Sequence, residues 1–74
     1  MAILTKRSIT LAGHATSLAL EPEFWAVLDA MAAARTWSLA HLISWIDQTR
    51  GERPLASACR VAALEFAAAG SAVA

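Results

Sequence analysis

The sequence has little of what usually stabilises a small domain from within. It contains 74 residues and a single cysteine, Cys59, so no internal disulfide can form, and one thiol cannot make a zinc site. The hydrophobic core of a chain of this length rarely contributes more than about 3–5 kcal/mol to the free energy of folding. Because 58% of the residues are hydrophobic and only 16% are charged, too few surface-type residues remain to cover a monomer. The composition therefore favours an oligomer.

Other absences exclude whole classes of protein. No segment has the run of apolar residues that a membrane span needs. The stretch after Met1 lacks the apolar run and the cleavage pattern of a signal peptide, so we expect a protein of the reducing cytoplasm. No carboxylate pair stands in an apolar setting, and no Ser-His-Asp or Cys-His arrangement is plausible in so short a chain. We therefore expect no enzymatic activity.

The two histidines suggest no metal chemistry either. His14, His41 and Cys59 lack metal-ligand spacing, so we expect no metal and no cofactor. The formal net charge is zero, which does not by itself favour nucleic acid, because attraction to phosphate supplies most non-specific affinity for DNA. Lys6 and Arg7, however, lie together near the N-terminus, where they could contact phosphate.

The stretch from Thr16 to Trp25 carries the most informative pattern. Leu18 and Leu20 alternate with small residues, and a helical pattern begins directly after Pro22. The period thus changes from two residues to 3.6 with almost no loop between. A single strand cannot satisfy its own backbone groups, and its nearest partner is the same strand from a second copy. The pattern predicts a homodimer built on a two-stranded ribbon.

Residues 4–12 also alternate, with Ile9 and Leu11 on one face, so the whole region over residues 4–20 has strand character. Either the two runs form a hairpin, or the first is an arm that continues into the second through a bulge at Gly13. The choice matters, because a two-stranded ribbon fits the major groove of DNA. A four-stranded sheet made from two hairpins would be too wide.

Three helices are predicted after the ribbon, over residues 21–35, 38–50 and 55–69. Ser38 is a good N-cap for the second helix. Gly70 is expected to end the third helix, whose apolar face is mostly alanine. The whole chain, residues 1–74, then forms one domain that is mainly α with a short N-terminal β-ribbon.

The three tryptophans call for separate interpretations. Trp25 is expected in the core of a dimer. Trp37 stands just before the N-cap of the second helix, where it can pack against a residue one turn on. Trp45 lies off the apolar stripe of that helix. It either packs under the third helix or belongs to an exposed patch that binds a second protein. The third helix could also contact such a protein.

Taken together, several short pieces of the chain resemble the ribbon-helix-helix proteins, the Arc and MetJ type of β-ribbon DNA readers. More narrowly, the chain is similar to a bacterial subgroup of small domains in which a third helix follows. The pieces that carry the resemblance are Arg7-Ser8-Ile9-Thr10, Gly13-His14, Thr16-Ser17, Leu20-Glu21-Pro22-Glu23-Phe24-Trp25, Ser38-Leu39, Ile46-Asp47, Arg60-Val61 and Leu64-Glu65.

The resemblance implies an intertwined homodimer whose paired strands enter the major groove of double-stranded DNA. Outward side chains would meet the groove, and backbone amides at the start of the second helix would bind a phosphate. The groove contacts would be Lys6, Arg7, Ser8, Thr10, Ala15, Ser17 and Ala19. The phosphate site would be formed by Ser38, Leu39 and Ala40. The dimer core would contain Leu18, Leu20, Phe24, Trp25, Leu28, Leu42, Ile43 and Ile46.

The chain departs from the family pattern on the outward face of the strand. Family ribbons usually carry Arg, Lys, Asn or Gln there, whereas Ala15 and Ala19 can at most touch a thymine methyl group. Two hypotheses of function therefore remain. The first is a DNA-binding transcription regulator. The alternative is a dimeric protein-interaction module of the same fold that has lost base-specific DNA binding.

Overall fold

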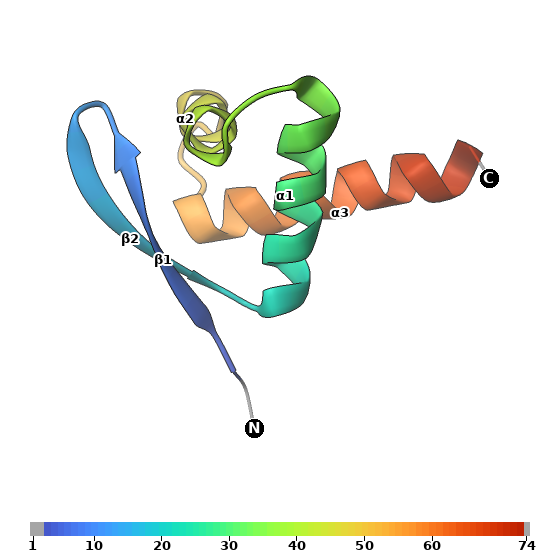
Figure 1. The fold of residues 1–74 in the computed structure, drawn as a ribbon, viewed down its shortest axis with the longest axis horizontal. Coiled ribbons are helices and arrows are strands. Elements are labelled where there is room, and N and C mark those ends of the chain that lie inside the picture. Colours follow the sequence, from blue (N-terminus) through green and yellow to red (C-terminus); the bar gives the residue numbers. More distant parts are fainter. Residues whose placement is uncertain (1–2, 74) are drawn as a thin grey trace.

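The chain forms a hairpin followed by three helices in a computed structural model that describes the backbone of residues 3–73 and the side chains of residues 3–70. All three helices lie on one side of the hairpin (Figure 1). The elements in chain order are β1 (Thr5–Leu11), β2 (His14–Leu20), α1 (Pro22–Arg35), α2 (Leu39–Thr49) and α3 (Leu55–Val73).

The hairpin decides between the two interpretations of the N-terminal region. β1 and β2 pair antiparallel, in a register that runs from Thr5 opposite Leu20 to Leu11 opposite His14. Ala12 and Gly13 connect them with φ angles of 51° and 82°, and two positive φ angles are what a type I′ hairpin turn requires. The strand partner of β2 is therefore β1 of the same chain. This corrects the premise that the nearest strand partner of β2 is the same strand of a second copy.

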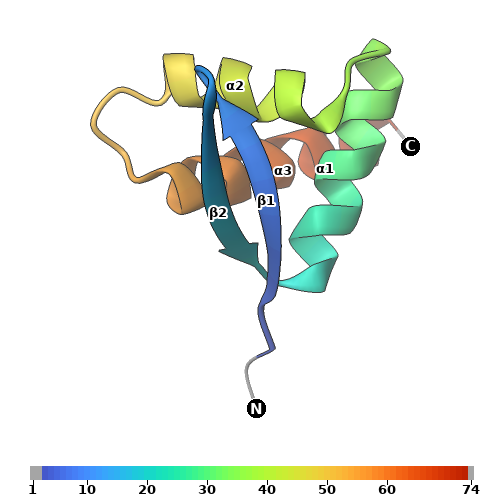
Figure 2. The same ribbon diagram turned by 60° about the vertical axis from the view of Figure 1, so that its left-hand side comes forward.

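The two faces of the hairpin have opposite environments. Ile9, Leu11, Leu18 and Leu20 are buried on the inner face, where β1 lies against α2 and β2 lies against α3 (Figure 2). Side chains alternate between the two faces of a strand, so the residues between these positions point away from the helices. The inner face thereby becomes one wall of the hydrophobic core.

The core closes within a single chain. The residues expected to form the core of a dimer are all buried by elements of their own chain, except Phe24, which is half-buried. Trp25, for example, is only 2% exposed. These residues therefore form or border a hydrophobic core within the single chain.

Local geometry fixes both the start and the end of helix α1. Pro22 occupies its first turn, where a missing N–H costs nothing. At the other end Thr36 adopts a left-handed conformation with φ of 59°, and the N–H of Trp37 donates to the carbonyl of Ala32 at 2.9 Å. This Schellman-type arrangement ends the helix without a glycine. It also turns the chain sharply into α2.

Helix α2 begins as the sequence predicts, whereas α3 is longer than predicted. The Ser38 hydroxyl oxygen accepts a hydrogen bond from the backbone N–H of His41 at 3.0 Å, which confirms the N-cap. Helix α3 continues through Gly70 to Val73. The prediction that Gly70 ends it was wrong, because one glycine costs only about 1 kcal/mol in a helix and the neighbouring alanines are strong helix formers. Among residues 3–73, no helix is both long and apolar enough to cross a membrane.

Candidate nucleic-acid interface

The outer face of the hairpin gathers almost all the groove contacts that the sequence predicts. Cross-strand pairs place Lys6 opposite Ala19, Ser8 opposite Ser17, and Thr10 opposite Ala15. All of these side chains are exposed except that of Ala19, which is half-buried. We call these six residues the outer face. Their mostly small side chains leave the backbone of both strands open to close approach.

Arg7 lies on the other side of the hairpin. Its guanidinium group donates two hydrogen bonds to the Asp29 carboxylate, at 3.1 and 3.3 Å. The guanidinium carbon also lies 4.6 Å from the centroid of the Trp25 ring. Since Asp29 and Trp25 both belong to α1, the role of Arg7 in this structure is to hold β1 against α1. It does not share a surface with Lys6.

The two strands differ in the hydrogen bonds that they receive from outside the β ladder. The ring N–H of Trp25 donates to the backbone carbonyl of Thr5 at 2.7 Å, so α1 already uses an acceptor of β1. Within residues 3–73, no hydrogen bond outside the β ladder reaches β2. An edge strand with unpaired N–H and C=O groups is a template for another strand. Within the part of the chain that the structure describes, the edge of β2 has no such partner.

The start of α2 offers backbone donors. Ser38 is engaged as the N-cap of the helix, and among the described residues no acceptor reaches the backbone N–H of Leu39 or of Ala40. The first turn of a helix leaves such donors unpaired, and the macrodipole adds a partial positive charge there. These residues have the donors that an anion needs.

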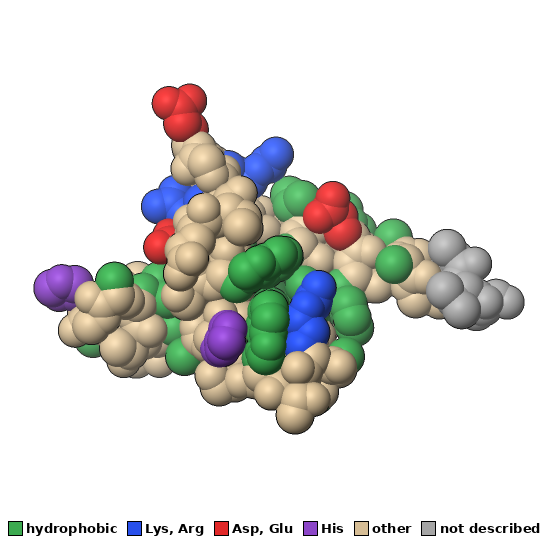
Figure 3. All heavy atoms as spheres, turned by 90° about the horizontal axis from the view of Figure 1, so that it is seen from above, with side chains coloured by type: hydrophobic (Ala, Val, Ile, Leu, Met, Phe, Trp, Pro, Cys, Tyr) green, Lys and Arg blue, Asp and Glu red, His purple; other side chains and the backbone are tan. Residues whose placement is uncertain are grey.

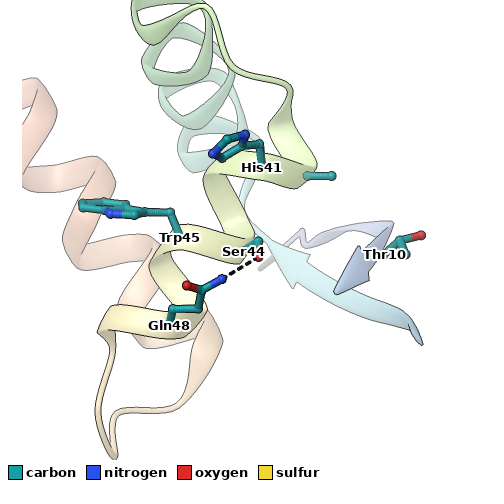
Figure 4. A pocket seen from close by; sticks show the side chains of 6 residues that line it. Thr10, His41, Ser44, Trp45 and Gln48 are labelled. Atoms are coloured by element: carbon teal, nitrogen blue, oxygen red, sulfur yellow. Dashed lines mark hydrogen bonds between the residues drawn. The ribbon is translucent and has the colours of Figure 1, made fainter. Parts of the chain in front are cut away.

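A surface hollow joins the start of α2 to the hairpin. It has a volume of about 390 Å³, and Figure 4 shows its lining side chains on α2 and at the end of β1. Thr10 comes from the outer face, Ala40 comes from the first turn of α2, and the remaining residues extend along α2. The lining residues are Thr10, Ala40, His41, Ser44, Trp45 and Gln48.

Ser44 and Gln48 are functional candidates that the sequence analysis missed. The Gln48 amide nitrogen donates to the Ser44 hydroxyl oxygen at 3.2 Å, and both side chains lie along the hollow (Figure 4). With His41 they follow a spacing of three and four residues, which places them on one face of α2. This polar stripe was the signal that could have revealed them.

Ion pairs neutralise charge away from the outer face. The pairs Asp29–Arg7, Asp47–Arg50 and Glu21–Arg60 have N–O distances between 2.7 and 3.1 Å. The hydrogen bond from the Arg60 guanidinium lowers the pKa of Glu21. Lys6 is the one charged residue of the outer face, and among the described residues it has no ion-pair partner. The local charge there is positive although the net charge of the chain is zero.

The structure gives little support to covalent or metal chemistry. Cys59 is fully buried, and this burial raises the pKa of its thiol to about 11. A thiol with such a pKa is protonated at neutral pH and is a poor nucleophile. Among the described residues, no three His, Cys, Asp or Glu side chains are grouped as a metal ion would require.

The comparisons with known proteins agree with this architecture. A scan of protein families matches residues 4–67 to the family described as Ribbon-helix-helix domain. Comparison with curated proteins and comparison with solved structures each found no match. Members of the matched family are typically dimers that bind DNA in transcription regulators, and the family is not enzymatic. With nearly its whole length matched, the chain belongs to the ribbon-helix-helix domain family.

Proposed function

We propose that this chain is a DNA-binding transcription regulator that acts as a homodimer. The observation that carries the proposal is the hollow in which Thr10 of the outer face and Ala40 of the α2 start come together. The first residue belongs to the predicted groove contacts and the second to the predicted phosphate site. Their meeting at one hollow gives a continuous surface from the hairpin to α2.

In the proposed dimer, the β2 strands of two copies pair antiparallel through their free edges. Each chain contributes a complete hairpin, so the sheet has four strands with β2 and its counterpart at the centre. Three spacings of about 4.8 Å separate the outermost strands by about 14 Å, whereas the major groove is about 12 Å wide. The whole four-stranded sheet is therefore too wide to enter the groove, as expected from the sequence. In the proposed complex only its central pair enters, and the two β1 strands lie above the rims.

This arrangement divides the outer face between two tasks. Lys6, Ser8 and Thr10 on β1 face the DNA backbone, where lysine and hydroxyl groups contact phosphate. On β2, Ser17 is the only polar residue that faces the bases, and the alanines beside it can only pack against thymine methyl groups. We therefore expect binding that depends strongly on phosphate and discriminates weakly between base sequences.

The start of α2 anchors the dimer on the flanking backbone. The free N–H groups of Leu39 and Ala40, behind the Ser38 cap, would donate to a phosphate oxygen. Ser44 and Gln48 line the same hollow, so their side chains would extend this contact along the DNA backbone.

A titration of fluorescently labelled duplex DNA tests the proposal. Random DNA and the DNA upstream of the gene would be compared at about 50 mM and about 200 mM salt, a range over which phosphate-dependent affinity changes steeply. The Lys6→Ala variant should bind more weakly. Its log–log salt slope should fall by about 0.9 for each phosphate that the lysine no longer neutralises, which is about 1.8 per dimer.

Arg53→Ala is the matched control, because Arg53 is an exposed cation in the α2–α3 connection, away from the outer face. It should change neither affinity nor slope. If the unaltered protein fails to bind DNA at low salt, the proposal is wrong.

A second candidate function follows from the alanines of β2 and from Trp45, whose side chain is 41% exposed. A dimeric interaction module of the same fold would keep the β2 pairing and would use another protein as its ligand. The same titration separates the two candidates. A stable dimer that does not bind DNA at low salt favours the interaction module.

A further inference from the structure

Trp45 lines the hollow that reaches Thr10, and it also borders two further surface hollows beside α3. One hollow, of about 350 Å³, lies between α2 and α3, and the other, of about 290 Å³, lies between the end of α1 and α3. Trp45, Ala62 and Glu65 border both of them. The indole of Trp45 thus forms a ridge on an open surface rather than packing under α3.

Neighbouring groups hold this ridge in place. The Arg35 guanidinium carbon lies 5.5 Å from the ring centroids of both Trp37 and Trp45. The Trp37 ring in turn stacks on His41, with centroids 4.4 Å apart and planes inclined by 13°. Figure 3 looks onto this end of the molecule and shows hydrophobic, basic and histidine side chains side by side. An aromatic surface fixed in this way loses little conformational freedom when a partner covers it.

The α3 side of this surface has the pattern of a helix that packs against another helix. Ala62, Glu65, Phe66 and Ala69 follow spacings of three, one and three residues, which places them on one face. Small residues on that face allow two helix backbones to approach closely. In Figure 1, the last part of α3 extends past α1. We call Arg35, Trp45, Ala62, Glu65, Phe66 and Ala69 the Trp45 face.

The charges of the Trp45 face identify its partner. Arg35 and Glu65 line the same hollow, both are exposed, and within the described part of the chain neither forms an ion pair. A partner whose charges all have one sign, such as DNA or an acidic peptide, would be attracted by one of these residues and repelled by the other. A surface that carries both signs beside an apolar floor is complementary to itself, as an interface with twofold symmetry requires.

We propose that the Trp45 face is an interface between two copies of this chain. In it, α3 of one copy lies antiparallel to α3 of the other, and each Arg35 pairs with Glu65 of the partner subunit. None of the six residues of the Trp45 face belongs to the hairpin, so this interface is distinct from the β2 edge. A chain with two such surfaces joins dimers into larger assemblies.

Sedimentation equilibrium with charge-swapped variants tests this interface without DNA. Arg35→Glu alone and Glu65→Arg alone each place like charges in contact, so each should halve the mass of the largest species at a given concentration. The double variant Arg35→Glu, Glu65→Arg restores opposite charges across the twofold axis and should restore that mass. Circular dichroism melts would verify that all variants are folded.

Glu52→Arg is the control, because Glu52 is an exposed acid outside the Trp45 face. It should leave the mass unchanged. The proposal is overturned if the single swaps leave the mass of the unaltered protein's largest species unchanged, or if the double variant behaves like the single ones.

Discussion

The two faces of the β1–β2 hairpin are built from the same two strands of seven residues each but serve different purposes. The inner face carries Ile9, Leu11, Leu18 and Leu20, none of which is more than 9% exposed. The outer face carries mostly small or hydroxyl side chains that make few contacts with the rest of the molecule. Because alternate residues of a strand face opposite sides, each face can change without altering the other.

In our proposal, stability and DNA binding therefore reside on opposite sides of the same strands. Burying a large aliphatic side chain contributes about 1.5–3 kcal/mol, so the inner face fixes the hairpin on the helices. The outer face is mostly exposed and contributes little to folding. Substitutions on each face should reveal this separation.

The largest effect is expected at Leu20, which is fully buried at the end of β2. Leu20→Ala should lower the free energy of unfolding by about 2–5 kcal/mol, since it removes buried methyl groups and leaves a cavity. Ser17→Ala, on the outer face of the same strand, should change it by less than about 0.5 kcal/mol. Urea denaturation measures both, and similar losses for the two variants would contradict the separation of the faces.

A smaller effect is expected where α1 contacts β1. Trp25→Phe removes the hydrogen bond to the Thr5 carbonyl and should lower the free energy of unfolding by about 1–3 kcal/mol. Trp37→Phe is the control, because among the described residues the ring N–H of Trp37 has no acceptor. If both variants lose the same stability, the hydrogen bond to Thr5 does not hold the strand in place.

Adjacent residues on β1 should respond differently to truncation. Arg7→Ala should cost up to about 1 kcal/mol of stability, because its ion pair with Asp29 is partly exposed to solvent. It should leave the salt dependence of DNA binding unchanged. Lys6→Ala should have the reverse pattern, with weaker DNA binding and unchanged stability. Urea unfolding and DNA titration of the same two variant proteins measure both properties. Identical behaviour of the two variants would contradict the placement of Lys6 and Arg7 on opposite faces.

The smallest effect is expected from acid at Glu21, where the chain leaves β2. The Arg60 hydrogen bond lowers the pKa of the folded Glu21 carboxyl below its ordinary value of 4.5. The pair therefore stabilises the fold above that value, and the contribution is lost as the pH falls through the lowered pKa. The difference in denaturation midpoint between the unaltered protein and Glu21→Gln should shrink as the pH falls below 4.5.

Glu52→Gln is the matched control for this titration, since Glu52 is exposed and forms no ion pair within the described residues. Its difference from the unaltered protein should not depend on the Arg60 contact. A Glu21→Gln difference that stays constant from neutral pH to acid would argue against the Glu21–Arg60 pair.

Much of the fold could be predicted because its signals are local. Alternation marks both strands, and Ser38 marks the start of α2. The sequence does not decide between a hairpin and an arm, because the turn places Ala12 at a positive φ and alanine gives no signal for that conformation. The pairing of Arg60 with Glu21 joins residues 39 positions apart, and no local pattern contains such information.

The candidate site could be predicted only in pieces. Alternation identifies the outer face and places Arg7 on the opposite face, with Ile9 and Leu11, but it does not show that Arg7 contacts α1. The start of α2 is recognisable from its cap and from family resemblance. Ser44 and Gln48 were missed because their importance depends on the hollow that Thr10 and α2 form together. Such a hollow is a property of tertiary packing and not of either segment alone.

The outer face and the first turn of α2 together form the DNA-binding surface in our proposal. Amide chemical shifts of nitrogen-15-labelled protein, followed during titration with duplex DNA, locate the bound surface residue by residue. We expect the largest shifts at Lys6, Ser8, Thr10, Ser17, Leu39 and Ala40, with little change at Glu65 and Ala69 on the Trp45 face. Largest shifts on the Trp45 face, or no shifts at low salt, would contradict the proposal.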